Sequence, residues 1–123
     1  MDTNRGAIAI VDDDGGVRMA LRELLRSMGF EAVTFGSAEE FLDSGRTRQV
    51  GALIADVHLP GMTGAALVTA LADAGCTLPA LLITAHDDPA TAELIRRAGP
   101  IPHLRKPFSD EDLLDAMQRA LGT

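Results

Sequence analysis

Short apolar runs alternate with amphipathic segments along the whole chain. Three of the runs are continuous and have the length of β-strands, at residues 7–11, 52–55 and 80–83. A strand that is apolar at successive positions is covered on both faces, which is typical of a parallel sheet. Weaker runs at residues 31–35 and 101–104 are typical of edge strands. Pro102 favours an edge position for the last run, because proline has no backbone N–H to give to a neighbouring strand.

A helix signal follows each run, and the first such segment has one apolar face before Gly29, formed by Val17, Leu21, Leu24, Leu25 and Met28. Residues 37–40 predict a capping box at the start of the second helix. Residues 63–74 are rich in Ala and Leu, and Asp88 predicts an N-cap that is followed by a proline. Residues 109–112 open a last helix. Its inner face is predicted at Leu113, Leu114, Met117 and Leu121.

The order of these elements predicts an α/β protein in which a strand and a helix alternate five times, (βα)5. Parallel neighbours need right-handed crossovers, so we expect helices on both faces of a doubly wound, five-stranded parallel sheet. No repeat, low-complexity tract or linker divides residues 1–123, which we interpret as one domain. In such sheets the chemistry gathers beyond the carboxyl ends of the strands, so the residues that follow each strand are the candidates for function.

Composition narrows the classes of function. The 123 residues carry 11 basic and 18 acidic side chains, for a formal net charge of −7, and no Trp or Tyr. Such a surface repels phosphate backbones and offers little to stack on bases, which argues against direct binding of nucleic acid by this chain. The single cysteine cannot form an internal disulfide, and no apolar run approaches the length of a membrane span. We therefore expect a cytoplasmic protein that does not cross a membrane.

Reactive side chains follow four of the five runs. In chain order, residues 12–14 are all Asp after the first run, Asp56 follows the third, Thr84 the fourth and Lys106 the last. Taken singly, each has an ordinary explanation: an acid caps a helix, a hydroxyl begins a turn, and a lysine at an exposed strand end is a solvated charge. That all of them follow strands favours a functional site, because the carboxyl ends of parallel strands meet at one edge of the sheet and would bring these side chains together.

The chemistry of such a cluster points to phosphoryl transfer. Asp12, Asp13 and Asp56 bring up to three negative charges close together, and these cannot all stay ionised unless a cation joins them or a proton is taken up. Carboxylate oxygens at an open edge suit Mg²⁺ that keeps several waters. A magnesium ion beside a lysine and a hydroxyl neutralises the oxygens of a phosphoryl group, and an aspartate is then the natural nucleophile.

These residues resemble the receiver domain of two-component response regulators. The resemblance runs from about residue 7 to residue 121, and its motifs are residues 10–14 with Val17-Arg18, the stretch Asp56-Val57-His58-Leu59-Pro60-Gly61-Met62-Thr63-Gly64, residues 82–85 and Lys106-Pro107-Phe108. It implies a flavodoxin-like architecture with the strand order 2-1-3-4-5. It also implies a phosphoacceptor signalling domain that is not an enzyme in the usual sense, because it catalyses only its own phosphorylation and dephosphorylation.

The resemblance assigns a role to each acid. Asp56 would accept the phosphoryl group. Asp13 would bind Mg²⁺ directly and Asp12 mainly through water. Asp56 and the backbone carbonyl of His58 would complete the protein ligands. Asp14 could in principle be one of the acid pair, but the spacing to the first helix favours Asp12 and Asp13 and leaves Asp14 as the cap of that helix.

The resemblance also implies partners and a switch. Lys106 would pair with the phosphoryl oxygens, and Thr84 would move inward to hydrogen-bond them. The phosphoryl donor would be the phosphohistidine of a sensor histidine kinase. The switch residue coupled to Thr84 is usually Tyr or Phe, and His103 stands at that position here. Homodimerisation through the last two helices and the last strand is common among receivers with DNA-binding outputs. The chain fits either a stand-alone receiver or a fragment of a longer regulator.

All three histidines of the chain map to the same predicted edge. His58 follows the phosphoacceptor by two residues, His86 follows the hydroxyl by two, and His103 precedes the lysine by three. Our hypothesis is that His58 and His86 modulate how water reaches the phosphoryl group, so that the lifetime of the phosphorylated form depends on pH. Imidazole is a softer ligand than carboxylate, so the pair is also a candidate for adventitious Zn²⁺ or Ni²⁺. The alternative is coincidence, because strand-end loops are polar.

Three other functions compete with the receiver. Residues 12–16 resemble the Asp-x-Asp-Gly motif of haloacid dehalogenase phosphohydrolases, with Asp12 as nucleophile and Asp14 as acid/base. The chain is short for that class, and Asp56 would have no role in it. A flavin-binding electron carrier of this architecture needs a Ser/Thr/Gly-rich loop after the first strand and flanking aromatic residues, and the sequence has neither. A module without chemistry leaves the converging acids, hydroxyl and lysine unexplained.

Overall fold

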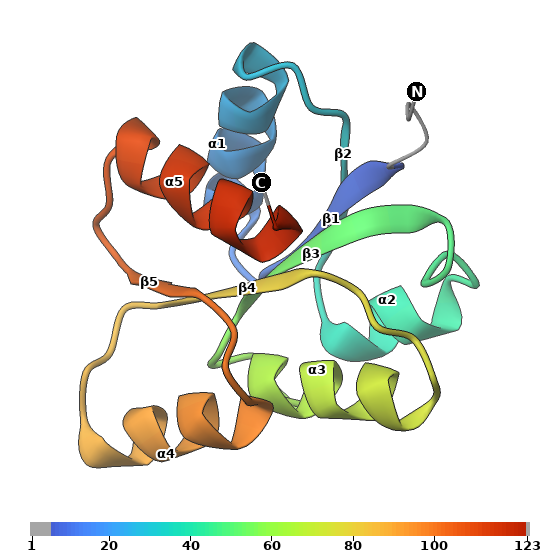
Figure 1. The fold of residues 1–123 in the computed structure, drawn as a ribbon, viewed down its shortest axis with the longest axis vertical. Coiled ribbons are helices and arrows are strands. Elements are labelled where there is room, and N and C mark those ends of the chain that lie inside the picture. Colours follow the sequence, from blue (N-terminus) through green and yellow to red (C-terminus); the bar gives the residue numbers. More distant parts are fainter. Residues whose placement is uncertain (1–5, 123) are drawn as a thin grey trace.

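The computed structural model describes residues 6–122, and within them five strands alternate with five helices (Figure 1). The strands are β1 (Ala7–Val11), β2 (Ala32–Phe35), β3 (Val50–Asp56), β4 (Ala80–Thr84) and β5 (His103–Arg105). The helices are α1 (Gly15–Ser27), α2 (Ala38–Asp43), α3 (Gly64–Asp73), α4 (Pro89–Ala98) and α5 (Asp110–Leu121). None of these helices is both long and apolar enough to cross a membrane.

The strands form one parallel sheet in the order β2-β1-β3-β4-β5. Helices α1 and α5 cover one face of the sheet, and α2, α3 and α4 cover the other (Figure 1). The doubly wound, flavodoxin-like fold with the order 2-1-3-4-5 is therefore confirmed. The chain leaves β1 toward β2 on one side and later returns to β3 on the other, so the carboxyl ends of β1 and β3 border the crevice in which such sheets bind ligands.

Two apolar layers hold the helices to the sheet. Alternate residues of β1 divide between them: Ala9 and Val11 pack toward α2, α3 and α4, whereas Ile8 and Ile10 pack toward α1 and α5. All five residues of β4 and six of the seven residues of β3 are buried. Burial on both faces explains why the central strands read as continuous apolar runs.

Two details of the sequence prediction are wrong. The regular pairing of β5 begins at His103 and not at residue 101. The carbonyl of Pro102 accepts a hydrogen bond from a backbone N–H of β4, but proline has no N–H to return, so the ladder starts one residue later. Leu114, assigned to the inner face of α5, is 37% exposed, while Ala116 is buried. Consecutive residues point about 100° apart around a helix, so Leu113 and Leu114 cannot both face the sheet.

Ser37 and Asp88 occupy the predicted N-cap positions, but the capping box predicted at residues 37–40 is only half formed, and Asp88 makes no side-chain cap bond. Ser37 caps α2 through a 3.0 Å hydrogen bond from the N–H of Glu40. The Glu40 carboxylate accepts from the N–H of Gly36, one residue before the one expected of a capping box. Asp88 occupies the N-cap position of α4, but its carboxylate accepts from the hydroxyl of Thr91 instead of capping the helix backbone.

Candidate functional site

The carboxyl edge of the sheet brings together the side chains selected from the sequence. Asp56 and Thr84 are the last residues of β3 and β4, and residues 12–13 directly follow β1. Carboxylate oxygens of Asp12, Asp13 and Asp56 all lie within 4.8 Å of one another. Lys106 follows β5, and its ammonium group contacts Asp12 and Asp56. Parallel pairing places four loops at one edge, and the acids, hydroxyl and lysine lie together as a consequence.

Backbone pairing continues beyond the strands and fixes where these loops begin. The N–H of Val57 donates to the carbonyl of Ile83 at 2.8 Å, which ties the residue after β3 to β4. The N–H of Lys106 donates to the carbonyl of Thr84 at 2.8 Å, which ties the residue after β5 to the end of β4. Side chains at this edge are therefore carried on rigid backbone, which favours a preorganised site.

Asp12 is the most enclosed acid of the cluster, at 1% exposed. One carboxylate oxygen accepts from the N–H of Asp14 at 2.9 Å, and the other lies 3.5 Å from the Lys106 Nζ. The guanidinium of Arg18 donates to the Asp12 carbonyl at 2.6 Å, which anchors the backbone from α1. Burial raises the pKa of Asp12 above its ordinary value, and the charge of Asp56 adds to this, against the opposing effects of the Asp14 N–H and Lys106.

Asp56 is 9% exposed and has two fixed contacts. Its Oδ1 accepts from the N–H of His58 at 2.9 Å, and its Oδ2 lies 3.4 Å from the Lys106 Nζ. The Lys106 side chain is only 25% exposed, which is less than its place at a strand end led us to expect. One ammonium group thus bridges two nearly buried carboxylates, and both the charge pair and the packing hold it there.

The donor set of this cluster fits a hard divalent cation. The exposed Asp13 adds a third carboxylate to Asp12 and Asp56, and the ammonium of Lys106 contacts only the latter two. Burial is the main cause that raises the pKa of Asp12, so its ionised form is poorly solvated, and a cation bound beside it would stabilise that form. Asp14 does not contribute, because its carboxylate caps α1 by accepting from the N–H groups of Gly16 and Val17. Oxygen-only donors with one solvent-exposed side are the environment in which Mg²⁺ binds proteins.

We expect Asp12→Asn to raise the free energy of unfolding when no divalent cation is present. A folded-state pKa above the ordinary 3.8 means that ionised Asp12 weakens the fold, with a cost that grows as pH rises from 3.8 through the raised pKa. Asparagine removes the charge and keeps the oxygen that accepts from Asp14. Urea unfolding with a chelator at neutral pH measures the gain, which should vanish below pH 3.8, where wild-type Asp12 is also neutral. A less stable variant at neutral pH would contradict this account.

Thr84 and His103, the predicted hydroxyl and switch residues, line one hollow of about 250 Å³ between α4 and β5. Thr84 is 2% exposed, and its Oγ1 accepts from the N–H of His86 at 3.0 Å. His103 is exposed. The hollow beside Thr84 therefore has space for a side chain to turn inward. His103, the candidate switch residue, lies at this hollow.

The loop after β3 is anchored by a residue that the sequence analysis did not select. The Glu39 Oε2 accepts from the N–H of Met62 at 2.9 Å, and this bond lowers the pKa of Glu39. Gly61 beside it has a φ of +76°, and a Cβ there would lie 2.6 Å from the same carboxylate. Glu39 precedes Met62 by 23 residues, so its position in the first turn of α2 is the only signal the sequence offers.

Gly64 is a second residue whose role appears only in the structure. It begins α3, and a Cβ built on it would lie 2.9 Å from the carbonyl carbon of Asp56 and closer still to the carbonyl oxygen. The N–H of Gly64 donates to the carbonyl of Val57 at 3.1 Å. The helix therefore approaches the end of β3 more closely than any other residue type allows. The sequence contains this glycine in a motif, but not the reason for it.

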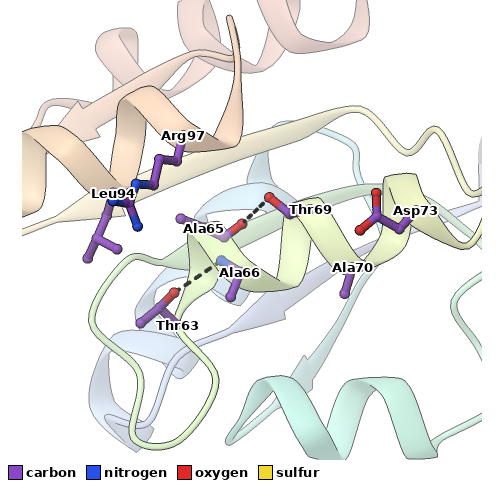
Figure 2. A pocket seen from close by; sticks show the side chains of 8 residues that line it. All are labelled: Thr63, Ala65, Ala66, Thr69, Ala70, Asp73, Leu94 and Arg97. Atoms are coloured by element: carbon purple, nitrogen blue, oxygen red, sulfur yellow. Dashed lines mark hydrogen bonds between the residues drawn. The ribbon is translucent and has the colours of Figure 1, made fainter.

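A separate groove of about 430 Å³ lies between α3 and α4 and contains none of the site residues (Figure 2). Thr63 and Thr69 at its floor make hydrogen bonds within α3, to the N–H of Ala66 and the carbonyl of Ala65. Leu94 and Arg97 line the groove from α4 (Figure 2). The groove has the character of a helix–helix seam lined by small side chains, and the reactive edge of the sheet lies elsewhere.

The comparisons with known proteins agree with this geometry. A family model described as the response regulator receiver domain matches residues 8–118. Nodulation protein W of Bradyrhizobium diazoefficiens is 37% identical over 118 residues, which are 96% of this chain and 52% of that protein. The response regulator protein TmoT of Ectopseudomonas mendocina is 40% identical over 121 residues, which are 98% of this chain and 55% of that protein. The chain thus spans about half the length of these curated relatives.

Solved structures give the same result. The crystal structure of FixJ-N superposes with a TM-score of 0.85 at 33% identity, over 95% of this chain and 94% of that chain. The chemotaxis protein CheY4 of Vibrio cholerae superposes with a TM-score of 0.82 at 29% identity, over 94% of this chain and 98% of that chain. Fold and site together define a doubly wound signalling module with an acidic pocket at its crevice. The chain belongs to the response regulator receiver domain family.

Proposed function

We propose that this receiver domain accepts a phosphoryl group on Asp56 from the phosphohistidine of a sensor histidine kinase. The observation that carries the proposal is the position of Asp56: a nearly buried carboxylate, held by the N–H of His58 and the Lys106 ammonium, within 4.8 Å of two further acids. In the transfer, one carboxylate oxygen of Asp56 forms the bond to phosphorus, the bond from phosphorus to the donor imidazole nitrogen breaks, and the imidazole keeps that electron pair.

The neighbouring residues divide the charge of the phosphoryl group between them. Asp12, Asp13, Asp56 and the backbone carbonyl of His58 would hold Mg²⁺, which supplies neutralisation of the phosphoryl oxygens as their charge develops. Lys106 already contacts Asp56 at 3.4 Å and would stay beside the phosphorylated side chain to pair with the added oxygens. The buried Thr84 hydroxyl would exchange its bond from the His86 N–H for one to the phosphoryl group.

The response to phosphorylation is proposed to run through β4 and β5. Inward movement of Thr84 would change the hollow that it shares with His103, and His103 would follow as the switch residue. Homodimerisation through α4, β5 and α5 stays a prediction, as do the cytoplasmic location and the interpretation of residues 1–123 as a single receiver domain. In this proposal the change begins at the phosphoryl group beside Lys106, continues through the Thr84 hydroxyl on β4, and reaches the protein surface at His103 on β5.

A phosphohydrolase of the haloacid dehalogenase class is disfavoured by one contact in particular. That class would use Asp14 as acid/base, but the Asp14 carboxylate accepts from the N–H groups of Gly16 at 2.8 Å and Val17 at 3.2 Å and is the cap of α1. Lys106 contacts not only Asp12 but also Asp56, which that class leaves without a role.

The proposed function is tested by incubating the chain with a small phosphodonor and Mg²⁺ and measuring its intact mass. A receiver gains one phosphoryl group per chain, in a linkage that hydroxylamine cleaves as it does acyl phosphates, and peptide mapping places that group on Asp56. Chelation of Mg²⁺ should prevent the gain. Continuous release of phosphate from many substrates without a stable adduct would instead identify a hydrolase, and no reaction with any donor would reject both.

An apolar groove beside the site is suited to the kinase. It has a volume of about 280 Å³ between α1 and the loop after β5, and it is lined by Val17, Ala20, Leu21, Leu24, Lys106, Pro107 and Phe108. A phosphohistidine must come within bonding distance of Asp56, so the domain that carries it has to dock on a surface that borders the site. This groove does so, because Lys106 belongs to both.

We therefore expect Ala20→Glu to slow phosphotransfer from a sensor kinase by about tenfold or more, as for a buried contact of an interface. Labelling by a small phosphodonor should be unchanged, because Ala20 is exposed and is not a member of the acid cluster. The matched control is Ala66→Glu, which adds the same charge on an exposed helical alanine in the other groove (Figure 2). Equal slowing by both variants would place the kinase surface elsewhere.

A further inference from the structure

Two histidines and an aspartate form a second ligand cluster next to the carboxylate site. His58 lies in the loop after β3, and His86 and Asp88 lie in the loop between β4 and α4. One donor atom of each residue lies within 4.8 Å of the other two, and all three side chains are exposed. The imidazole rings of His58 and His86 have their centroids 4.4 Å apart at an interplanar angle of 62°. The sequence indicated the histidine pair, and the structure adds the carboxylate.

A buried hydroxyl organises this cluster from beneath. Thr91, on the first turn of α4, is 1% exposed. Its Oγ1 donates to the Asp88 carboxylate, which can only accept while it is ionised, and the single hydroxyl proton is used in that bond. The Nε2 of His58 lies 2.7 Å from the same oxygen, so it must be the nitrogen that donates. The neutral His58 ring therefore carries its proton on Nε2, and its Nδ1 has a free lone pair.

This arrangement is the one that metal-binding histidines use. A ligating imidazole typically gives its other N–H to a hydrogen-bond acceptor, which fixes the tautomer and the direction of the ring. Here Thr91 is that acceptor for His58, and it also orients the carboxylate of Asp88. One residue thus holds two prospective ligands from different loops, and His86 lies beside them as the third.

We propose that His58, His86 and Asp88 form a binding site for Zn²⁺, with the two imidazoles and one carboxylate as ligands and a fourth position open to water. Two nitrogens and one carboxylate oxygen are a donor set that zinc accepts, whereas Mg²⁺ prefers oxygen alone. Zn–N and Zn–O bonds of about 2.0–2.2 Å put the donor atoms of a tetrahedral site roughly 3.3 Å apart. The exposed side chains reach that spacing by small rotations.

The site would join two loops that carry the reactive edge. The backbone N–H of His58 donates to Asp56, and that of His86 donates to Thr84. A zinc ion across the imidazoles would therefore hold the loop after β3 to the loop after β4, beside the phosphoacceptor and distinct from the carboxylate cluster. The site itself does not depend on Asp56 being phosphorylated, so the two proposals can fail separately.

Zinc binding is measured by competition with a chromogenic chelator, in a large excess of Mg²⁺ that occupies the carboxylate cluster. We expect one Zn²⁺ per chain, and His86→Ala should weaken the affinity by roughly a hundredfold, with Asp88→Asn intermediate. Thr91→Val, which keeps every ligand but removes the orienting hydroxyl, should weaken it by roughly 10–100-fold. The matched control is His103→Ala, because His103 is the third histidine of the edge and lies outside the ligand cluster.

The outcomes are separable. Weakening by His86→Ala and Thr91→Val with unchanged binding by His103→Ala supports the site. Affinity that is insensitive to His86→Ala, or equally reduced by His103→Ala, would overturn it, as would absence of binding when Mg²⁺ is in excess. His86 is exposed, so its variant should fold, and circular dichroism of each protein checks this. The imidazole proton resonances of His58 and His86 should shift on addition of zinc while those of His103 stay in place.

Discussion

Asp56→Asn is expected to abolish phosphoryl uptake from both a small phosphodonor and a sensor kinase. An amide oxygen is a far weaker nucleophile than a carboxylate, and Asp12, the other acid that Lys106 contacts, is proposed as a magnesium ligand. The fold should persist, because the asparagine oxygen can still accept from the N–H of His58. The Lys106 ammonium, which is a quarter exposed, can turn from the new amide toward Asp12, which it already contacts at 3.5 Å.

The experiment compares intact masses after reaction in saturating Mg²⁺. Asp73→Asn is the matched control: it makes the same substitution at an exposed acid on α3, and it should be labelled like the wild type. Circular dichroism and urea unfolding establish that Asp56→Asn is folded. A labelled Asp56→Asn protein would assign the phosphoryl group to another residue, with Asp13 the first to be examined because it shares the cluster.

The architecture was readable from the sequence because each element carries its own physical signature. Strands buried on both faces are apolar at successive positions, and β3 and β4 are of this kind. The edge strand β5 was harder to place. It is only three residues long, and its start depends on whether Pro102 can complete a ladder, which its missing N–H prevents. The strand order came from the family resemblance, since apolar runs alone do not determine which strands are neighbours.

The residues that form the site could also be predicted from the sequence, for one reason. Parallel strands end at a common edge, so residues that directly follow strands are brought together whatever the details of packing. Asp12 and Lys106 directly follow β1 and β5, and Asp56 and Thr84 are the last residues of β3 and β4. The degree to which these side chains are buried could not be predicted from the sequence, and Lys106 shows why. Its exposure is set by two acids that lie 94 and 50 residues away in the chain, and no local pattern encodes them.

Residues that support the site from a distance could not be selected from the sequence. Glu39 belongs to the first turn of α2, where an acid is favoured by the helix dipole regardless of any other role. Its bond to the Met62 N–H is visible only when the loop after β3 is folded against α2. Thr91 is a similar case, because a threonine in the first turn of a helix gives no sign that it joins His58 to Asp88.

Gly64→Ala should have the largest effect on stability of any single methyl group added near the site. The new Cβ would lie 2.9 Å from the carbonyl carbon of Asp56 and 3.3 Å from the Cβ of Ala55. Backbone cannot turn aside as a flexible side chain can, so α3 and the end of β3 must move apart. Overpacking of this kind costs about 1–3 kcal/mol. Because the displaced group is the backbone of the proposed phosphoacceptor, the rate of phosphoryl uptake should fall with the stability.

Gly15→Ala is the control for the helical position itself. Gly15 begins α1 as Gly64 begins α3, but a Cβ there would meet only the guanidinium of Arg18, at 3.5 Å. Alanine loses less backbone entropy on folding than glycine, so this variant should match the wild type or exceed it by about 0.5–1 kcal/mol. Urea unfolding of both variants measures the difference, and a small phosphodonor measures uptake. If Gly64→Ala were as stable and as readily phosphorylated as Gly15→Ala, the close approach of α3 to Asp56 would have no bearing on the site.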